Sequence, residues 1–261
     1  MYGMMKALDR IASLVFPPRC AVCGSVLAER DSPLCGGCME RWLCERAEYD
    51  GSPKADIEGV KRSYHLAFYT PSRMGKRTVA DTLAYSMKSG GSGSVYPFLA
   101  RQMCQRLYMS AVDGRREPND EDLRRLTGFF DIVSYIPRSR KNMLRFGVDQ
   151  SGMLARGISE LTGIPAARLF VNASDKTQHE LTEDERRENM SKLRLRKGAE
   201  DEIRGARVIL IDDIVTTGAT VSSAASLVAS AGASEIILTA PFRTRGGVQK
   251  HGEKRDPSER A

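Results

Sequence analysis

From residue 129 onward, short aliphatic runs alternate with longer stretches in which apolar residues recur every three or four positions. This alternation is typical of βαβ units, in which parallel strands are joined by helices. Gly232 is expected as the C′ residue that ends the last helix. The pattern predicts an α/β fold, a parallel sheet flanked by helices. The expected strands are residues 131–136, 169–171, 208–211 and 236–239. The expected helices are residues 150–161 and 220–231.

The first half of the chain has a mostly helical pattern. We expect a helix over residues 4–16 and a strand over residues 64–69. Two amphipathic helices are expected over residues 75–88 and 97–111. Pro17 and Pro18 end the first helix. The Ser-Gly run over residues 89–94 is expected to be a flexible break. Residues 113–122 are too charged and too rich in turn formers to join the core.

The cysteines fall into two CxxC pairs separated by eleven residues, while Cys44 and Cys104 stand apart. Four thiolates on two short knuckles are the ligand set of a tetrahedral Zn²⁺ site, and such a closed site is structural. Two buried thiol pairs, a redox CxxC and an iron–sulfur cluster are the alternatives. The expected zinc ligands are Cys20, Cys23, Cys35 and Cys38.

These patterns divide the chain into two units and a tail. The N-terminal helix and a double zinc ribbon are expected over residues 1–50. After about residue 43 the sequence predicts a polar, irregular connection that contains Gly51, Ser52, Pro53 and Gly59. The larger α/β domain is expected over residues 60–245, and a disordered basic tail over residues 246–261.

The composition narrows the class of protein. A formal net charge of +7 favours polyanionic partners, although dispersed basic residues can also be solvated helix faces. No window approaches the 18 or so uncharged apolar residues of a membrane span. Asp9 and Arg10 interrupt the first apolar stretch, so a signal peptide is not expected. The sequence therefore predicts a cytoplasmic protein without membrane insertion.

One segment carries the clearest chemistry. The aliphatic run over residues 208–211 is followed by two carboxylates and a turn of small residues that leads into a helix. Such a turn offers backbone N–H groups, hydroxyls and the positive end of a helix dipole to an anion. Adjacent carboxylates repel phosphate, so they suit ribose hydroxyls and a positive charge developing on a sugar. The alternative is a buried strand with a helix cap and two solvated aspartates.

The segment DDIVTTGAT resembles the signature of type I phosphoribosyltransferases. The resemblance implies 5-phosphoribosyl 1-pyrophosphate (PRPP) as ligand, with Mg²⁺ on its pyrophosphate. It implies that Asp212 and Asp213 are the catalytic pair that binds the ribose hydroxyls. The residues implied to hold the 5′-phosphate are Thr216, Thr217, Gly218, Ala219 and Thr220. The larger domain is thereby expected to have a type I phosphoribosyltransferase fold, preceded by a small four-cysteine zinc-knuckle module.

A zinc-knuckle module in front of such a domain resembles the ComF family of competence-related bacterial proteins. The similar segments include residues 145–155 and 177–190. The resemblance implies substrate contacts in a pyrophosphate loop and in a mobile loop over residues 178–189, for which an exposed charged helix is the alternative. The substrate-binding residues implied beyond the phosphate turn are Pro137, Arg138, Arg140, Arg145, Arg186 and Arg187.

The ComF resemblance leaves two functions open. One is transfer of the phosphoribosyl group to a nitrogen nucleophile, in a role connected with DNA uptake. The other is binding of PRPP or nucleic acid without turnover, with single-stranded DNA or a competence helicase as partner. An autonomous amidotransferase is not expected, because Cys20 lies within a CxxC pair. The sequence does not predict the oligomeric state or the acceptor.

Overall fold

The computed structural model describes residues 17–28, 32–49, 56–70, 77–89, 93–112, 116–138, 147–172 and 193–245. The expected helix over residues 4–16, the loop over residues 178–189 and the tail over residues 246–261 lie outside these ranges.

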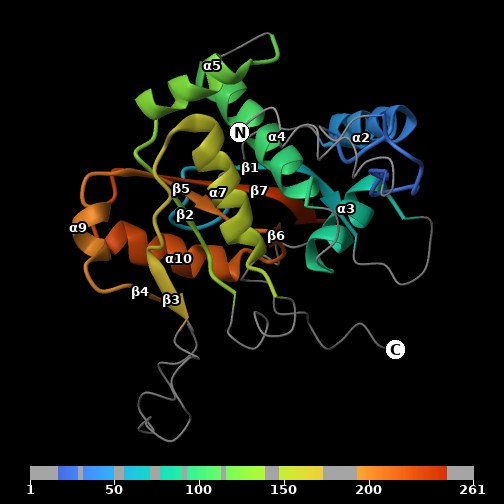
Figure 1. Ribbon diagram of the computed structural model, residues 1–261. Coiled ribbons are helices and arrows are strands. Elements are labelled where there is room, and N and C mark those ends of the chain that lie inside the picture. The colour runs from blue at the N-terminus through green and yellow to red at the C-terminus, as the bar shows by residue number, and fades with distance from the viewer. Residues whose placement is uncertain are drawn as a thin grey trace, which may run out of the picture.

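The centre of the molecule is a five-stranded parallel sheet (Figure 1). Its order is β1-β7-β5-β2, with β6 also paired to β7. The aliphatic side chains of β5 are buried, as expected for a parallel strand covered on both faces. The strands expected around residues 64, 132, 208 and 236 are therefore confirmed. Their bounds are β1 (Arg62–Tyr69), β2 (Ile132–Tyr135), β5 (Arg207–Ile211), β6 (Ile214–Val215) and β7 (Glu235–Thr244).

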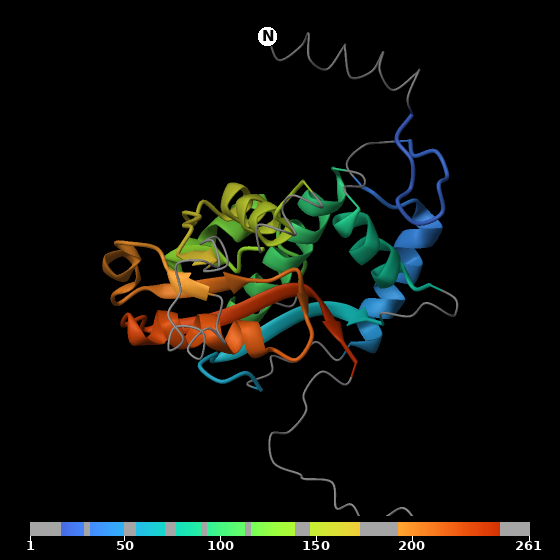
Figure 2. The ribbon, with the colours of Figure 1, turned by 90° about the horizontal axis from the view of Figure 1, so that it is seen from below.

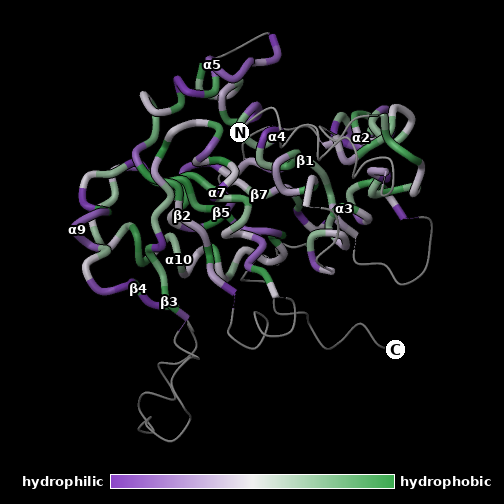
Figure 3. Tube along the Cα trace, in the orientation of Figure 1, coloured by the Kyte–Doolittle hydropathy of each residue, from purple (hydrophilic) through white to green (hydrophobic). Residues whose placement is uncertain are grey.

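Helices cover both faces of this sheet (Figure 2). Ile209 and Ile211 of β5 belong to the hydrophobic cluster on one face, and Val208 and Leu210 to the cluster on the other. The most apolar part of the chain is accordingly the sheet between the helix layers (Figure 3). The first face is covered by α3 (Val79–Lys88), α4 (Val95–Val112) and α7 (Gln150–Thr162), and the second by α9 (Ala199–Ile203) and α10 (Ala219–Ser230).

Two segments differ from the sequence prediction. The strand expected over residues 169–171 is β3 (Phe170–Asn172), which pairs antiparallel with β4 (Leu193–Leu195) in a separate two-stranded sheet. The chain touches the main sheet only just before β3, where Ala166 forms a parallel bridge with Val133 of β2. The expectation that this strand joins the parallel sheet is therefore wrong.

The charged segment before residue 123 also contributes to the core, contrary to expectation. It contains α5 (Asp120–Arg124), which continues into the 3₁₀ helix η1 (Arg125–Gly128). Asn119 and Asp122 form a capping box at the start of α5, and Asp122 is only 2% exposed. Burial of this carboxylate is possible because it accepts the Asn119 N–H at 3.1 Å and pairs with Arg116 at 2.6 Å.

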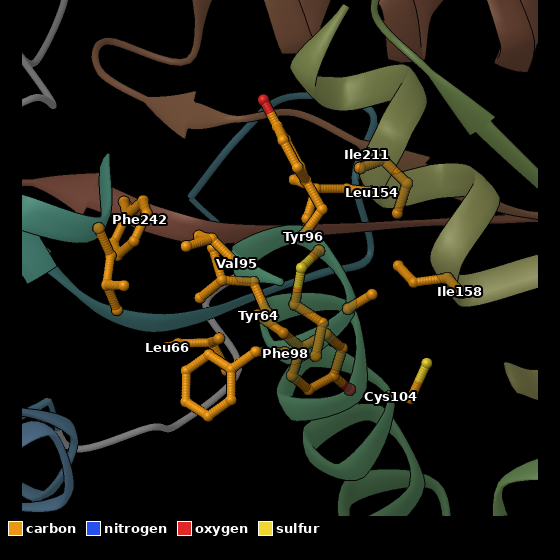
Figure 4. Packing of buried hydrophobic residues seen from close by; sticks show 14 of the residues in the cluster. Tyr64, Leu66, Val95, Tyr96, Phe98, Cys104, Leu154, Ile158, Ile211 and Phe242 are labelled. Atoms are coloured by element: carbon orange, nitrogen blue, oxygen red, sulfur yellow. The ribbon is translucent and has the colours of Figure 1, made fainter. Parts of the chain in front are cut away.

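The cysteine module is joined to the large domain by a helix that the sequence pattern did not predict. This helix, α2 (Gly36–Glu48), spans the region expected to become irregular after residue 43. Its Trp42 is fully buried, with its ring 6.2 Å from Phe98 of α4 and 6.4 Å from Phe242 of β7. Cys20 and Cys38 belong to this same hydrophobic cluster. Figure 4 shows Phe98 and Phe242 within it. The module and the sheet therefore share one core.

A second contact fixes α2 against α3. The carboxylate of Glu45 accepts hydrogen bonds from the backbone N–H groups of Val79 and Ala80, at 2.8 and 2.9 Å. These are N–H groups of the first turn of α3, which have no partner within the helix. Glu45 thus acts as a capping residue supplied by another helix. Among the described helices, none is long and apolar enough to cross a lipid bilayer.

Candidate functional site

The sheet topology places the candidate site between β2 and β5. After β2 the chain passes through α7 to the outer edge of the sheet, where Ala166 lies beside Val133. After β5 it passes through β6 and α10 to β7, on the opposite side. Ligands in open α/β sheets bind where the connections diverge in this way, beyond the carboxyl ends of the strands. Pro137 and Arg138 follow β2 there, and Asp212 and Asp213 follow β5.

An ion pair joins these two strand ends. Arg138 Nη2 lies 2.7 Å from Asp213 Oδ2, and the two side chains are only 15% and 18% exposed. The Arg138 backbone N–H donates to Asp149 Oδ2 at 3.3 Å, while Pro137 is buried. The structure thus brings together the segment expected to contact pyrophosphate and the segment expected to contact ribose.

Asp212 has different surroundings from Asp213. Burial, and then the negative charge of Asp213, raise the pKa of Asp212 to about 8. The Asp213 N–H donates to Asp212 Oδ1 at 2.9 Å, and the Ile214 N–H donates to Asp213 Oδ1 at 2.8 Å. Since Arg138 pairs with Asp213, that carboxylate has a cation beside it. At neutral pH Asp212 can therefore hold a proton, while Asp213 forms the ion pair with Arg138.

The turn before α10 has the geometry of an anion site. Gly218 stands at the N-cap with φ +79°, a left-handed conformation that residues with a side chain rarely adopt. Thr216 and Thr217 are exposed, and the Ala219 N–H lies 3.4 Å from Thr217 Oγ1. Gly218 has no side chain to cap the helix, so apart from the Ala219 N–H, which Thr217 accepts, the first turn of α10 offers its N–H groups to an anion. Exposed Thr220 lies in that first turn.

Lys88 is a residue of this site that the sequence pattern did not single out for binding. It ends α3, and its ammonium lies 5.0 Å from the ring centroid of Tyr69. Burial lowers the pKa of Lys88. The negative charge of Asp213 acts in the opposite direction, and the positive charge of Arg138 lowers the pKa further. The ammonium is therefore close enough to sense both members of the ion pair. In the sequence, the feature that could have indicated Lys88 is its position as the basic residue in the last turn of an amphipathic helix.

Tyr96 and Asp149 complete the surroundings. Burial raises the pKa of each, and both sense the charges of Arg138 and Asp213. Tyr96 Oη donates to the Met87 carbonyl at 2.8 Å, which ties α4 to the end of α3. Asp149 caps α7 by accepting the Gly152 N–H at 3.2 Å. The other residues expected to bind substrate lie outside the described residues: Arg140, Arg145, Arg186 and Arg187.

The four expected zinc ligands lie together. The Sγ atoms of Cys20, Cys23, Cys35 and Cys38 all lie within 4.8 Å of one another, and Cys23 Sγ is 3.6 Å from Cys35 Sγ. Tetrahedral Zn²⁺ with bonds of about 2.3 Å needs sulfur separations of about 3.8 Å, so the cluster fits the ion. Burial opposes ionisation of Cys20, but backbone N–H groups of Cys23, Cys35 and Val22 lower its pKa overall. The cluster could therefore bind zinc.

Local turns hold the first two cysteines. Gly24 has φ +76°, its N–H donates to the Cys20 carbonyl at 2.9 Å, and the Cys20 N–H donates to the Ser25 carbonyl at 2.8 Å. Arg19 and Val26 flank this turn as an antiparallel bridge. The second pair is held differently, because Cys35 is the N-cap of α2 and Cys38 lies in its first turn.

Comparison with known proteins agrees with this geometry. Residues 130–258 match the family model described as the phosphoribosyl transferase domain. The chain therefore carries a phosphoribosyltransferase-type domain, and its parallel sheet flanked by helices is a type I phosphoribosyltransferase fold, as predicted. No curated protein matches the chain.

Several solved structures are similar over part of the chain. The allosteric regulatory enzyme of purine biosynthesis is 20% identical over 56% of this chain and 26% of its own, with a TM-score of 0.34. Glutamine PRPP amidotransferase from B. subtilis is 17% identical over 60% of this chain and 30% of its own, with a TM-score of 0.36. Hypoxanthine phosphoribosyltransferase from Trypanosoma cruzi is 13% identical over 61% of this chain and 74% of its own, with a TM-score of 0.34. This chain thus matches less than a third of the length of the first two.

Proposed function

We propose that the chain binds PRPP with Mg²⁺ between β2 and β5 and transfers the phosphoribosyl group to a nitrogen nucleophile. The observation that carries the proposal is the joint position of the Asp212–Asp213 pair and the open N-terminus of α10, five residues further along the chain. The carboxylate pair suits ribose hydroxyls, and the helix N-terminus suits a 5′-phosphate. The phosphoribosyl transferase domain match over residues 130–258 supports this choice of ligand.

Each part of the site would have its own task. Asp212 and Asp213 would accept hydrogen bonds from the ribose hydroxyls and favour positive charge on the ring as the bond from the anomeric carbon to pyrophosphate breaks. The turn over Thr216, Thr217, Gly218, Ala219 and Thr220 would hold the 5′-phosphate. The acceptor nitrogen then bonds to the anomeric carbon and loses its proton to water.

Arg138 is placed to meet the leaving group. Its guanidinium follows Pro137 and pairs with Asp213 at 2.7 Å, so a pyrophosphate bound there could exchange that carboxylate for phosphate oxygens. Mg²⁺ on the pyrophosphate would neutralise charge on the leaving group and orient it. The charges of Arg138 and Asp213 also act on the pKa values of Lys88 and Tyr96, so both side chains lie near the ion pair.

Calorimetric titration with PRPP and Mg²⁺ tests the binding part of the proposal. We expect saturable binding to the wild type and an affinity about 10- to 100-fold lower for the Asp212→Asn, Asp213→Asn double variant, since hydrogen bonds to charged groups contribute about 1.5–3 kcal/mol. Asp201→Asn is the matched control, because Asp201 is an exposed acid on α9. Equal PRPP affinity in all three proteins would sink the proposed site.

Release of pyrophosphate in the presence of nucleobases or amines tests the catalytic part. Turnover by the wild type, and its loss in the double variant, would establish transfer. Binding of PRPP without pyrophosphate release from any nitrogen acceptor would leave a binding protein and end the claim of catalysis.

A second candidate is a ComF-type role in which the chain binds single-stranded DNA or a helicase without turnover. The net charge of +7 favours it, because basic side chains near nucleic acid release counterions. Filter binding at increasing salt separates the two candidates. DNA affinity that falls steeply with salt and survives the Asp212→Asn, Asp213→Asn change supports this role, whereas absence of DNA binding at low salt removes it.

A further inference from the structure

A cavity with two arginines in its lining lies between α2, β1 and α4 and includes no residue of the phosphate turn. Its volume is about 270 Å³, just below the range of roughly 300–1,000 Å³ typical of small-molecule sites. Two half-buried arginines, Arg46 of α2 and Arg106 of α4, line it, and no lining residue carries a carboxylate. The complete lining, named here the α2–α4 cavity, is Leu43, Arg46, Ala47, Tyr49, His65, Leu66 and Arg106.

The two arginines hold like charges close together. Burial, followed by the positive charge of Arg106, lowers the pKa of Arg46. Glu117 acts in the opposite direction, but its carboxylate accepts a hydrogen bond from Gln105 Nε2 at 3.0 Å. Arg46 itself donates to the side-chain oxygen of Gln102. Because Gln102 Nε2 donates to Gln105 Oε1 at 2.9 Å, the two glutamines connect Arg46 to Glu117, and the structure shows no ion pair between the described side chains of Arg46 and Glu117.

Neighbouring arginines of the same region are paired with acids. Arg101 of α4 pairs with Asp120, and Arg116 pairs with Asp122. Within the part of the chain that the structure describes, Arg46 and Arg106 form no such ion pair. Two half-buried cations without an acid repel each other, and an anion between them would remove that repulsion.

We propose that the α2–α4 cavity binds a phosphate group between Arg46 and Arg106. Guanidinium forks match phosphate oxygens in bidentate geometry, which favours this anion over a halide. The rings of Tyr49 and His65, with centroids 6.2 Å apart, and the side chain of Leu66 form another part of the wall. The phosphate could come from a mononucleotide or from the backbone of single-stranded nucleic acid. The site is independent of the proposed PRPP site.

Arginine side-chain NMR on the full-length protein tests the proposal with inorganic phosphate as the probe. The Nε–Hε signals of Arg46 and Arg106 are assigned by their absence from spectra of Arg46→Gln and Arg106→Gln. Both signals should shift saturably with phosphate in the wild type, compared with chloride at equal ionic strength. In Arg106→Gln, the phosphate affinity that the Arg46 signal reports should fall at least tenfold.

Arg41→Gln is the matched control. Arg41 is exposed on α2, does not line the cavity, and its substitution changes the net charge by the same amount. The response of Arg46 and Arg106 to phosphate should survive in this variant. A linear response equal to that of chloride, or an undiminished response of Arg46 in Arg106→Gln, would overturn the proposal.

Two further measurements keep the outcome clear. Arg106→Gln should have the melting temperature of the wild type and retain its PRPP affinity, which separates this site from the PRPP site. Arg106→Lys provides a second variant, in which the positive charge is kept. Titrations with adenosine 5′-monophosphate and with a short oligothymidylate then compare the two sources of phosphate. A saturable shift of the Arg46 signal with either supports the site, and a response to neither contradicts it.

Discussion

Asp212 and Asp213 are adjacent in the sequence but experience opposite environments. Arg138 pairs with Asp213, while burial and the negative charge of Asp213 raise the pKa of the half-buried Asp212. A carboxyl group whose pKa is raised by burial, as at Asp212, is common at functional sites because it can hold a proton near neutral pH. A double carboxylate motif alone does not reveal which of its two residues has the raised pKa.

The raised pKa of Asp212 predicts a pH dependence of stability. Between its ordinary value near 3.8 and about 8, the folded chain holds a proton at Asp212 that the unfolded chain has lost. Stability from this group therefore falls as pH rises through that interval. Asp212→Asn, which mimics the neutral form, should lose this decline. Its melting temperature relative to the wild type should be higher at about pH 9 than at about pH 5, in protein free of ligand. If the difference in melting temperature between the two proteins stays the same from about pH 5 to about pH 9, the raised pKa of Asp212 is contradicted.

At the scale of elements, the packing of α4 on α7 depends on one glycine. A Cβ built on Gly157 would come within 2.9 Å of the Ala100 Cβ, closer than such atoms normally approach. Gly157→Ala should therefore destabilise the fold although alanine favours helices. We expect a net loss of about 1–2 kcal/mol, from an overpacking cost of about 1–3 kcal/mol and a propensity gain of up to about 1 kcal/mol.

Urea unfolding measures this effect, and a double variant controls it. Adding Ala100→Gly removes the methyl group that the new Cβ would meet, so the double variant should cost less than the sum of the two single changes. Strict additivity of the two substitutions would show that the close approach of the helices is not the cause.

The contact between α2 and α3 leads to a second prediction for elements. Glu45→Ala leaves the Val79 and Ala80 N–H groups without their shared acceptor, so unfolding free energy should fall by about 0.5–2 kcal/mol, as for loss of a helix cap. Glu40→Ala is the control, because Glu40 is exposed on the same helix. Chemical denaturation should separate the two variants. Equal stability of the two would exclude a capping role for Glu45.

At the scale of the whole molecule, the four-cysteine cluster and the sheet share a hydrophobic core through Cys38 and Trp42. If zinc holds the cluster, its loss should destabilise the whole chain and not the first residues alone. Cys38→Ser should lower the melting temperature in a single transition. A contribution of about 3 kcal/mol corresponds to about 6–12 °C for a chain of this size.

Cys44→Ser is the control for this prediction, since Cys44 is exposed and lies outside the cluster. Calorimetric melting and metal analysis of both variants provide the readout. A separate low-temperature transition in Cys38→Ser, with the main transition unchanged, would mean that the module unfolds by itself.

The sequence predicted the main parallel sheet because period and composition act locally. The aliphatic run of β5 and the helical spacing of α7 and α10 are each visible within about a dozen residues. In contrast, α2 buries few positions, and Trp42 finds its partners Phe98 and Phe242 far along the chain. Such a helix is defined by tertiary contacts, which no local pattern contains.

The candidate site divides in the same way. The carboxylate pair and the small-residue turn lie within one continuous segment, so their spacing already indicated a ribose and phosphate site. The approach of Lys88 and Tyr96 depends on how α3 and α4 cross the end of the sheet. Likewise, the ion pair between Arg138 and Asp213 joins two residues that are 75 positions apart in the chain.

The position of β7 has a consequence for biosynthesis. This strand pairs with β1, β5 and β6, and its Ile237 lies opposite Arg62 of β1. A ribosome that adds about 5–20 residues per second needs roughly 10–35 s to proceed from one of these residues to the other. Among the described strands β1 pairs with β7 alone, so during that interval β1 lacks this neighbour and its apolar side chains are open to chaperones or to other nascent chains. Translation speed between these two strands would then influence how much of the protein reaches its native state.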